Sequence, residues 1–135
     1  MDLSGKVCVI TGASSGIGKS LSIKFASKGA SVALAARRKS KLTSITDEIK
    51  QSGGNAIGIK TDITKSIECK NLIDETLDQY GRIDLLLLGA GGSMWTPFEK
   101  ISNISFFKDV MDTNYTGAVH SVSYTHLTLP TTPYV

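Results

Sequence analysis

A glycine-rich turn, TGASSGIG at residues 11–18, carries the strongest chemical signal in the sequence. It follows the apolar run KVCVIT, which we interpret as a buried strand, and it opens a segment predicted to be a helix. Glycine lets the backbone approach a pyrophosphate closely, and the N–H groups at a helix start attract phosphate oxygens. The turn therefore predicts a dinucleotide-binding loop. Its candidate cofactor-binding residues are Gly12, Ser14, Ser15, Gly16, Ile17 and Gly18.

The spacing of these glycines departs from the usual dinucleotide fingerprint, G-x-G-x-x-G. Only Gly16 and Gly18 fit that pattern, and Leu21 stands where the third glycine would be. The alternative interpretation is a tight strand-to-helix turn that binds nothing. The strand before the turn and the helix after it favour the cofactor.

Two arginines follow the second apolar run, SVALAA at residues 31–36. A site that selects NAD places an aspartate or glutamate there, about 20 residues beyond the glycines, to bond the ribose 2′-hydroxyl. This chain has Arg37 and Arg38 instead, and a guanidinium binds a 2′-phosphate in a bidentate way. We therefore predict NADP(H), with Arg37 as the first candidate and Arg38 as the second. The alternatives are a solvated basic turn, or a localisation or nucleic-acid patch formed by RRKSK.

Strands and helices that alternate along the chain must position these residues. Buried strands are predicted for four apolar runs, at residues 6–11, 31–36, 55–60 and 83–90. Amphipathic helices are predicted at residues 12–29, 41–54, 67–81 and 105–121. In the first helix, Ile17, Leu21 and Phe25 lie on one face. Strand–helix units of about 30 residues form βαβ crossovers, so we expect an α/β fold with a parallel sheet.

The loop TGASSGIG resembles the cofactor loop of the short-chain dehydrogenase/reductase family. The resemblance runs from about Lys6 to His120, and three later motifs follow in the family's order. The first is TDIT after the third predicted strand, which resembles the family's segment with an aspartate that hydrogen-bonds the adenine ring. That resemblance assigns Asp62 and its neighbour Ile63 to the cofactor site.

The second motif is GAG after the fourth predicted strand, which resembles the family's Asn-Asn-Ala-Gly and assigns Ala90 and Gly91 to the cofactor site. Leu88 and Gly89 replace the two asparagines, which brace the centre of the sheet in the family. The bracing hydrogen bonds must therefore come from other residues.

The third motif is NYTG, which puts Asn114 and Gly117 in register with the family's Asn-x-x-Gly. In the family, the matching asparagine joins a catalytic tetrad with serine, tyrosine and lysine. The resemblance therefore implies a catalytic role for Asn114. The alternative is a polar residue that bends a helix.

The family's fold is a Rossmann-like doubly wound parallel sheet, and its activity is hydride transfer between a nicotinamide and a carbonyl or alcohol substrate. The resemblance implies an incomplete sheet of about four strands in the order 3-2-1-4, and a homo-oligomeric parent protein. The fourth strand, central in the family, would become an exposed apolar edge. We therefore expect the chain alone to be poorly soluble and to lack reductase activity.

The end of the chain does not resemble the family. Members carry a Tyr-x-x-x-Lys motif further along, and no tyrosine of this chain has a lysine four residues on. The segment VSYTHLTLPT looks like one reading frame of a sequencing adapter. We expect residues 1–121 to be an NAD(P)-binding half-domain and residues 122–135 a non-native tail, the alternative being a real truncated isoform. The parent is expected to be an NADP-dependent reductase, and a non-catalytic binding or regulatory module is the second hypothesis.

Composition and charge argue against nucleic-acid binding, membrane spanning and metal binding. The net charge of +3 is too small to imply a nucleic-acid partner, and the longest apolar run is too short to span a bilayer. Cys8 and Cys69 form no metal-ligand spacing, so we expect reduced thiols, no metal site and a cytoplasmic location. Trp95 either faces an apolar substrate or packs on the following helix.

Overall fold

The computed structural model describes residues 2–93 and 95–126. Within these residues four strands form one parallel sheet in the order β3-β2-β1-β4, which confirms the predicted topology. The strands are β1 (Val7–Thr11), β2 (Ser31–Ala36), β3 (Asn55–Lys60) and β4 (Leu85–Leu88). β1 and β2 are covered on both faces, and for this reason their sequences are almost continuously apolar.

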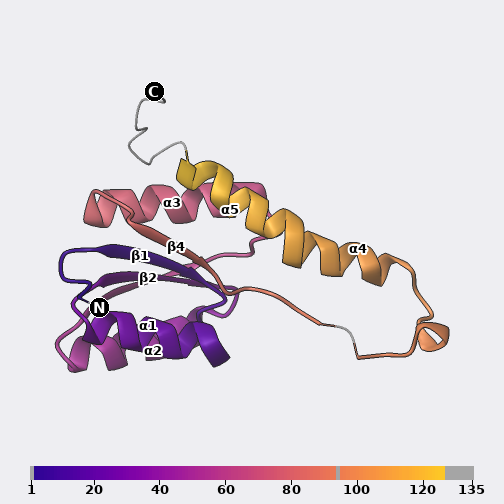
Figure 1. Ribbon diagram of the computed structural model, residues 1–135, viewed down its shortest axis with the longest axis horizontal. Helices are drawn as coiled ribbons and strands as arrows, with labels where there is room; N and C mark the ends of the chain where they lie inside the picture. The colour runs from indigo at the N-terminus through magenta and orange to yellow at the C-terminus, as the bar shows by residue number, and fades with distance from the viewer. Residues whose placement is uncertain (1, 94, 127–135) are drawn as a thin grey trace.

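Helices cover both faces of the sheet (Figure 1). On one side lie α1 (Gly16–Ser27) and α2 (Lys39–Gln51), and on the other lie α3 (Ser66–Tyr80) and α5 (Gly117–His126). Each side has its own core: Leu42, Ile45 and Ile49 of α2 belong to the first, and Leu72 and Ile73 of α3 belong to the second. The doubly wound arrangement expected from the sequence is therefore confirmed.

The buried face of α1 agrees with the predicted one only in part. Phe25 packs against the first core and Leu21 is half-buried, but the fully buried residues are Gly18, Ser22 and Ala26, and Ile17 is 78% exposed. Small residues let the helix approach the first turn closely, since a Cβ at Gly18 would collide with the carbonyl oxygen of Gly12. The apolar periodicity predicted the helix correctly. Which of its residues are fully buried depends on the close packing of its small side chains.

β4 forms one edge of the sheet and is the least buried strand among the described residues. Leu85 is 37% exposed and Leu88 is 43% exposed, so the predicted burial of this strand is wrong and the expected apolar edge is present. At the start of β4, the Asp84 carboxylate accepts a hydrogen bond of 2.9 Å from the Val7 N–H. This bond helps to fix β4 beside β1.

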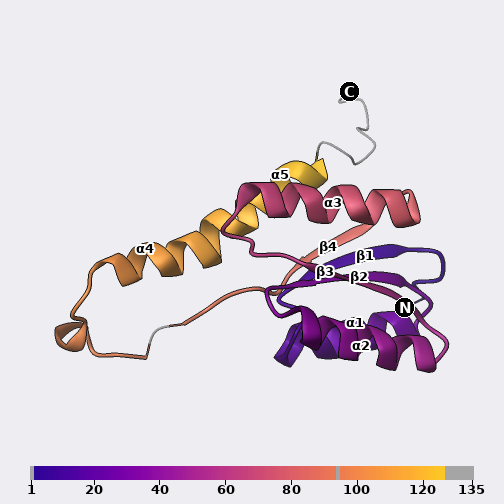
Figure 2. The same ribbon diagram turned by 180° about the vertical axis from the view of Figure 1, so that it is seen from behind.

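The segment after β4 leaves the body of the molecule as an arm and returns through α4 (Ser105–Met111), as two opposite views show (Figures 1 and 2). The 3-10 helix η1 (Phe98–Lys100) lies on this arm, where the rings of Phe98 and Phe107 stand 5.9 Å apart. A π turn, η2 (Asp112–Thr116), separates α4 from α5. The single helix predicted for residues 105–121 is therefore interrupted by a wider turn that contains Asn114.

α5 continues through the predicted boundary at residue 122 and is described as far as His126. Tyr124 packs against the second core, and its hydroxyl lies 2.9 Å from the hydroxyl of Ser66. Thr125 is buried. The rest of the expected tail, residues 127–135, lies outside the described residues, and the boundary at residue 122 stays a prediction.

Candidate functional site

A groove of about 950 Å³ runs along the carboxyl ends of the strands, where β1 and β4 lie side by side. All of the residues predicted to bind the cofactor line it. They are Gly12, Ser14, Ser15, Gly16, Ile17, Gly18, Arg37, Arg38, Asp62, Ile63, Ala90 and Gly91. These residues are far apart in the sequence. The parallel sheet brings them together beside β1 and β4, where the order of the strands changes direction.

The sequence analysis missed several lining residues. These are Ala36, Thr61, Thr64, Gly89, Asp109, Asp112 and Thr113. Thr61 and Thr64 flank the Asp62 motif, so their place at the end of β3 could have identified them. The chain returns to the groove through α4 and η2, which bring Asp109, Asp112 and Thr113 to its lining. No local sequence pattern predicts this return.

The glycines of the first turn have different physical roles. Gly12 has a φ of +66°, and a Cβ there would lie 2.5 Å from the Gly89 carbonyl oxygen. Gly16 has a φ of +54°, but a Cβ there would meet nothing within 4 Å. Gly12 is therefore required by close packing against the end of β4, whereas Gly16 is required by its backbone conformation alone.

The start of α1 is open to an anion. Ser15 precedes the helix in an extended conformation, and its side chain makes no capping hydrogen bond. The first turn of α1 contains no acidic residue, so its N–H groups face the groove without a competing carboxylate. The exposed side chain of Ile17 borders the same space. These features fit the pyrophosphate and adjacent ribose of a dinucleotide.

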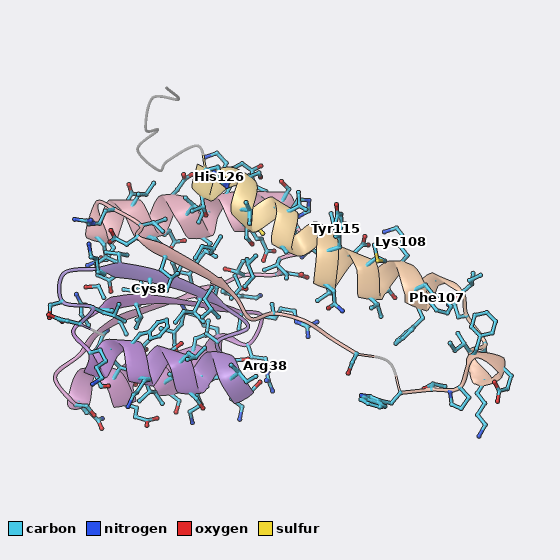
Figure 3. The ribbon with its side chains drawn as sticks, viewed as in Figure 1. Cys8, Arg38, Phe107, Lys108, Tyr115 and His126 are labelled. Atoms are coloured by element: carbon cyan, nitrogen blue, oxygen red, sulfur yellow. The ribbon has the colours of Figure 1, made fainter. Side chains whose placement is uncertain are left out.

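Arg38 lies at the carboxyl-terminal end of the sheet (Figure 3) and lines the groove. Its Nη2 donates a hydrogen bond of 3.3 Å to Oγ of Ser14. Arg37 also lines the groove, and its charge acts on the carboxylate of Asp62. The two neighbouring arginines thus face different parts of the site: Arg38 faces the glycine turn and Arg37 faces the loop after β3.

Asp62 begins a tight turn after β3. Its Oδ1 accepts hydrogen bonds from the backbone N–H of Thr64, at 3.0 Å, and from the Thr64 hydroxyl, at 2.7 Å. Burial raises the pKa of this carboxyl, but the Thr64 hydrogen bonds and the charges of Lys65 and Arg37 together lower the pKa below its ordinary value. The backbone N–H of Asp62 donates to Glu68 at 2.6 Å. Asp62 is therefore an anchored, ionised acceptor at neutral pH.

Thr11 braces the junction between β1 and the chain that follows β4. Its hydroxyl accepts a hydrogen bond of 3.4 Å from the Ala90 N–H and donates one of 3.5 Å to the Leu87 carbonyl. A Cβ at Gly89 would lie 2.7 Å from the Thr11 carbonyl oxygen, so a side chain there would push β1 and the end of β4 apart. Gly89 and Thr11 therefore belong to one closely packed junction.

Asn114 lies beside the main groove, in a neighbouring pocket of about 430 Å³ with Ala90, Gly91, Gly92 and Ser93. Its Nδ2 donates to the Gly92 carbonyl at 2.6 Å, and its Oδ1 accepts from the Gly92 N–H at 2.8 Å. This pair of bonds fixes the chain after β4 to the π turn. Both polar atoms of the side chain are engaged with Gly92, and the π turn also agrees with the alternative that Asn114 bends the helix.

The arm near the groove does not pack as predicted. Trp95 is 93% exposed, and its Nε1 donates to the Ser93 hydroxyl at 3.2 Å. The interpretation that Trp95 packs on the following helix is wrong, because almost all of its side chain is exposed.

Among residues 2–93 and 95–126, no three histidine, cysteine, aspartate or glutamate side chains are grouped so that they could hold a metal ion. No helix there is both long and apolar enough to cross a membrane.

Comparison with known proteins adds a family and several relatives. The sequence profile described as short chain dehydrogenase matches residues 6–129. The 11-beta-hydroxysteroid dehydrogenase 1A of Arabidopsis thaliana is 40% identical over 121 residues, which are 89% of this chain and 35% of that protein. An uncharacterized oxidoreductase of Listeria innocua is 39% identical over 123 residues, which are 91% of this chain and 49% of that protein.

Solved structures show the same arrangement. A short-chain type dehydrogenase/reductase from Mycobacterium marinum superposes with a TM-score of 0.89 at 35% identity, covering 94% of this chain and 51% of that one. A hydroxysteroid dehydrogenase from Escherichia coli gives a TM-score of 0.87 at 34% identity, covering 92% of this chain and 52% of that one. The chain thus spans about half the length of these structures.

Proposed function

The chain belongs to the short-chain dehydrogenase family, and from this premise we propose that it is the NADP(H)-binding part of an oxidoreductase. The whole protein would transfer hydride between the nicotinamide and a small carbonyl or alcohol substrate. The nicotinamide, when bound, supplies or accepts that hydride. The observation that carries the proposal is the groove itself, because its lining joins a glycine turn, an open helix start, two arginines and an anchored aspartate.

Each part of the groove has a role in binding. The N–H groups at the start of α1 would hold the pyrophosphate in the open space beside Gly16. The adenine amino group would donate to Asp62, whose Oδ1 is held by Thr64. Ala90, bonded to Thr11, and Gly91, which precedes the Gly92 that Asn114 holds, would border the ribose next to the nicotinamide.

The preference for NADP(H) over NAD(H) rests on Arg37, Arg38 and Ser14. Residues 35–38 contain no carboxylate that would repel a 2′-phosphate. The bond between Arg38 and Ser14 supports the preference, since it holds a guanidinium and a hydroxyl together beside the place where the ribose would lie. Arg37 would add charge from the adenine side.

For the whole protein, we propose a cytoplasmic homo-oligomer in which Asn114 belongs to the catalytic tetrad. Its bonds to Gly92 support a positioning contribution, because they fix the pocket beside the groove. The names of several relatives make hydroxysteroids the first substrates to test with NADPH. We also propose that residues 122–135 are a non-native tail. Sequencing of the transcript across the codons for these residues tests this.

Thermal unfolding with and without cofactor tests the binding proposal. A ligand that binds only the folded state stabilises it by RT ln(1 + [L]/Kd). NADPH should therefore raise the midpoint of unfolding, and an equal concentration of NADH should raise it less. No shift with either cofactor would contradict binding, and equal shifts would contradict the preference for NADP(H).

A further inference from the structure

His120 contacts the backbone of Ile63, a residue that lines the groove. It lies on α5, half-buried, with its Nδ1 3.1 Å from the carbonyl oxygen of Ile63. A carbonyl oxygen can only accept a hydrogen bond, so Nδ1 must carry the proton. Ile63 lines the groove next to Asp62, the proposed adenine ligand. The imidazole therefore holds backbone that the cofactor would contact on its other side.

The approach of α5 to this wall is built into the sequence. A Cβ at Gly117 would lie 2.7 Å from Cγ1 and Cδ1 of Ile63, so glycine is needed for the helix to come this close. His120 follows three residues later and lies on the same helical face. Gly117 thus provides the close approach and His120 provides the hydrogen bond.

The other donor to the Ile63 carbonyl is weak. Sγ of Cys69 lies 3.4 Å from it, and a thiol is a poor hydrogen-bond donor. Ser121 stands one residue after His120, and its hydroxyl points to Gly117 at 3.0 Å and to Cys69 at 3.7 Å. Without the imidazole, the Ile63 carbonyl would keep only the thiol among the hydrogen bonds of the described residues.

We propose that His120 is a positioning residue, which holds the Asp62–Ile63 segment where the adenosine half of the cofactor binds. The inference rests on the proposed function, since it assigns Asp62 to the adenine. It also explains how one helical stretch serves both ends of the site: Asn114 holds Gly92 on one wall, and His120 holds Ile63 on the other.

Three variants test this role in the full 135-residue chain, fused to a soluble carrier domain. His120→Leu removes the donor and keeps an apolar side chain. His120→Asn restores an N–H at the position of Nδ1. His126→Leu is the matched control, because His126 is an exposed histidine on the same helix. The measurements are the dissociation constants of NADPH and of adenosine 2′-monophosphate, and amide exchange in residues 61–65.

The expected result is that His120→Leu weakens both ligands by the same factor, about three- to tenfold, which corresponds to one neutral hydrogen bond. Amide exchange should become faster in residues 61–65 and stay unchanged in the glycine turn. His120→Asn should recover most of the affinity, and His126→Leu should behave as the original chain.

Unchanged exchange in residues 61–65 of the His120→Leu variant would overturn the inference, whatever the cofactor does. Weakened NADPH with unchanged adenosine 2′-monophosphate would overturn it as well, because the effect would then lie outside the adenosine half. Failure of the original chain to bind either ligand would instead overturn the proposed function, and the exchange measurement would still decide the role of His120.

Discussion

Nη2 of Arg38 lies 3.3 Å from Oγ of Ser14, and this contact joins the end of β2 to the glycine turn that follows β1. The two residues are 24 positions apart in sequence. The parallel pairing of β1 with β2 brings their carboxyl ends together and makes the contact possible. The contact places a cation and a hydroxyl at the edge of the groove, where a 2′-phosphate would distinguish NADP(H) from NAD(H).

Replacement of Arg38 should therefore affect one cofactor and spare the other. Arg38→Ala should weaken NADPH by roughly ten- to a hundredfold, since a charge-assisted hydrogen bond contributes about 1.5–3 kcal/mol, and should change NADH less than about twofold. Fluorescence titration of the two reduced cofactors measures this. Lys41→Ala, an exposed cation on the following helix, is the matched control. An equal loss for both cofactors would show that Arg38 does not read the 2′-phosphate.

The glycines of the first turn should respond differently to alanine. Gly12→Ala should cost about 2–4 kcal/mol of unfolding free energy, because its Cβ meets the backbone of Gly89 as well as a positive φ. Gly16→Ala should cost only about 1 kcal/mol, the conformational penalty alone. Gly53→Ala, with a positive φ and open space, is the control for that penalty. Urea unfolding of the three variants measures the difference, and equal costs for Gly12 and Gly16 would refute the packing role of Gly12.

Removal of the Asn114 side chain should loosen the chain after β4. Asn114→Ala should lower the free energy of unfolding by about 1–2 kcal/mol, because two hydrogen bonds to Gly92 are lost. It should also speed amide exchange at Gly92. Asn71→Ala, which removes an exposed amide bonded to Glu75, should cost less than about 0.5 kcal/mol. Unchanged exchange at Gly92 would contradict the positioning contribution.

Asp84 should make stability depend on pH in acid. The hydrogen bond from Arg82 lowers the pKa of the Asp84 carboxyl below the ordinary 3.8. Desolvation raises this pKa, whereas the hydrogen bond from the Val7 N–H and the charge of Lys6 lower it further. The unfolded chain therefore binds more protons in acid, so this stabilisation is complete above the ordinary pKa and disappears as the pH falls through the folded pKa.

Asp84→Asn tests this dependence. The variant should be about 1 kcal/mol less stable than the original chain near neutral pH, and the difference should shrink below about pH 4. Asp74→Asn, at an exposed helical ion pair with Lys70, is the control. A difference that stays constant down to strong acid would show that the charge of Asp84 contributes nothing to folding.

Sequence patterns predicted the sheet because buried parallel strands are nearly continuous apolar runs, and the glycine turn because its motif is local. They failed where close packing in three dimensions decides which residues meet. The buried face of α1 depends on how closely Gly18 approaches Gly12, and the bracing by Thr11 depends on the pairing of β1 with β4. The contact between His120 and Ile63 joins residues 57 positions apart, so no local pattern could reveal it.

Calorimetric titration of the 135-residue chain, fused to a soluble carrier domain, with NADPH and with NADH tests most directly that the groove is an NADP(H) site. The account expects one binding site per chain and an affinity for NADPH at least about tenfold higher than for NADH, as a single charge-assisted contact to the 2′-phosphate provides. Equal affinities would contradict the role assigned to the arginines. Absence of binding by a folded chain would contradict the cofactor site itself.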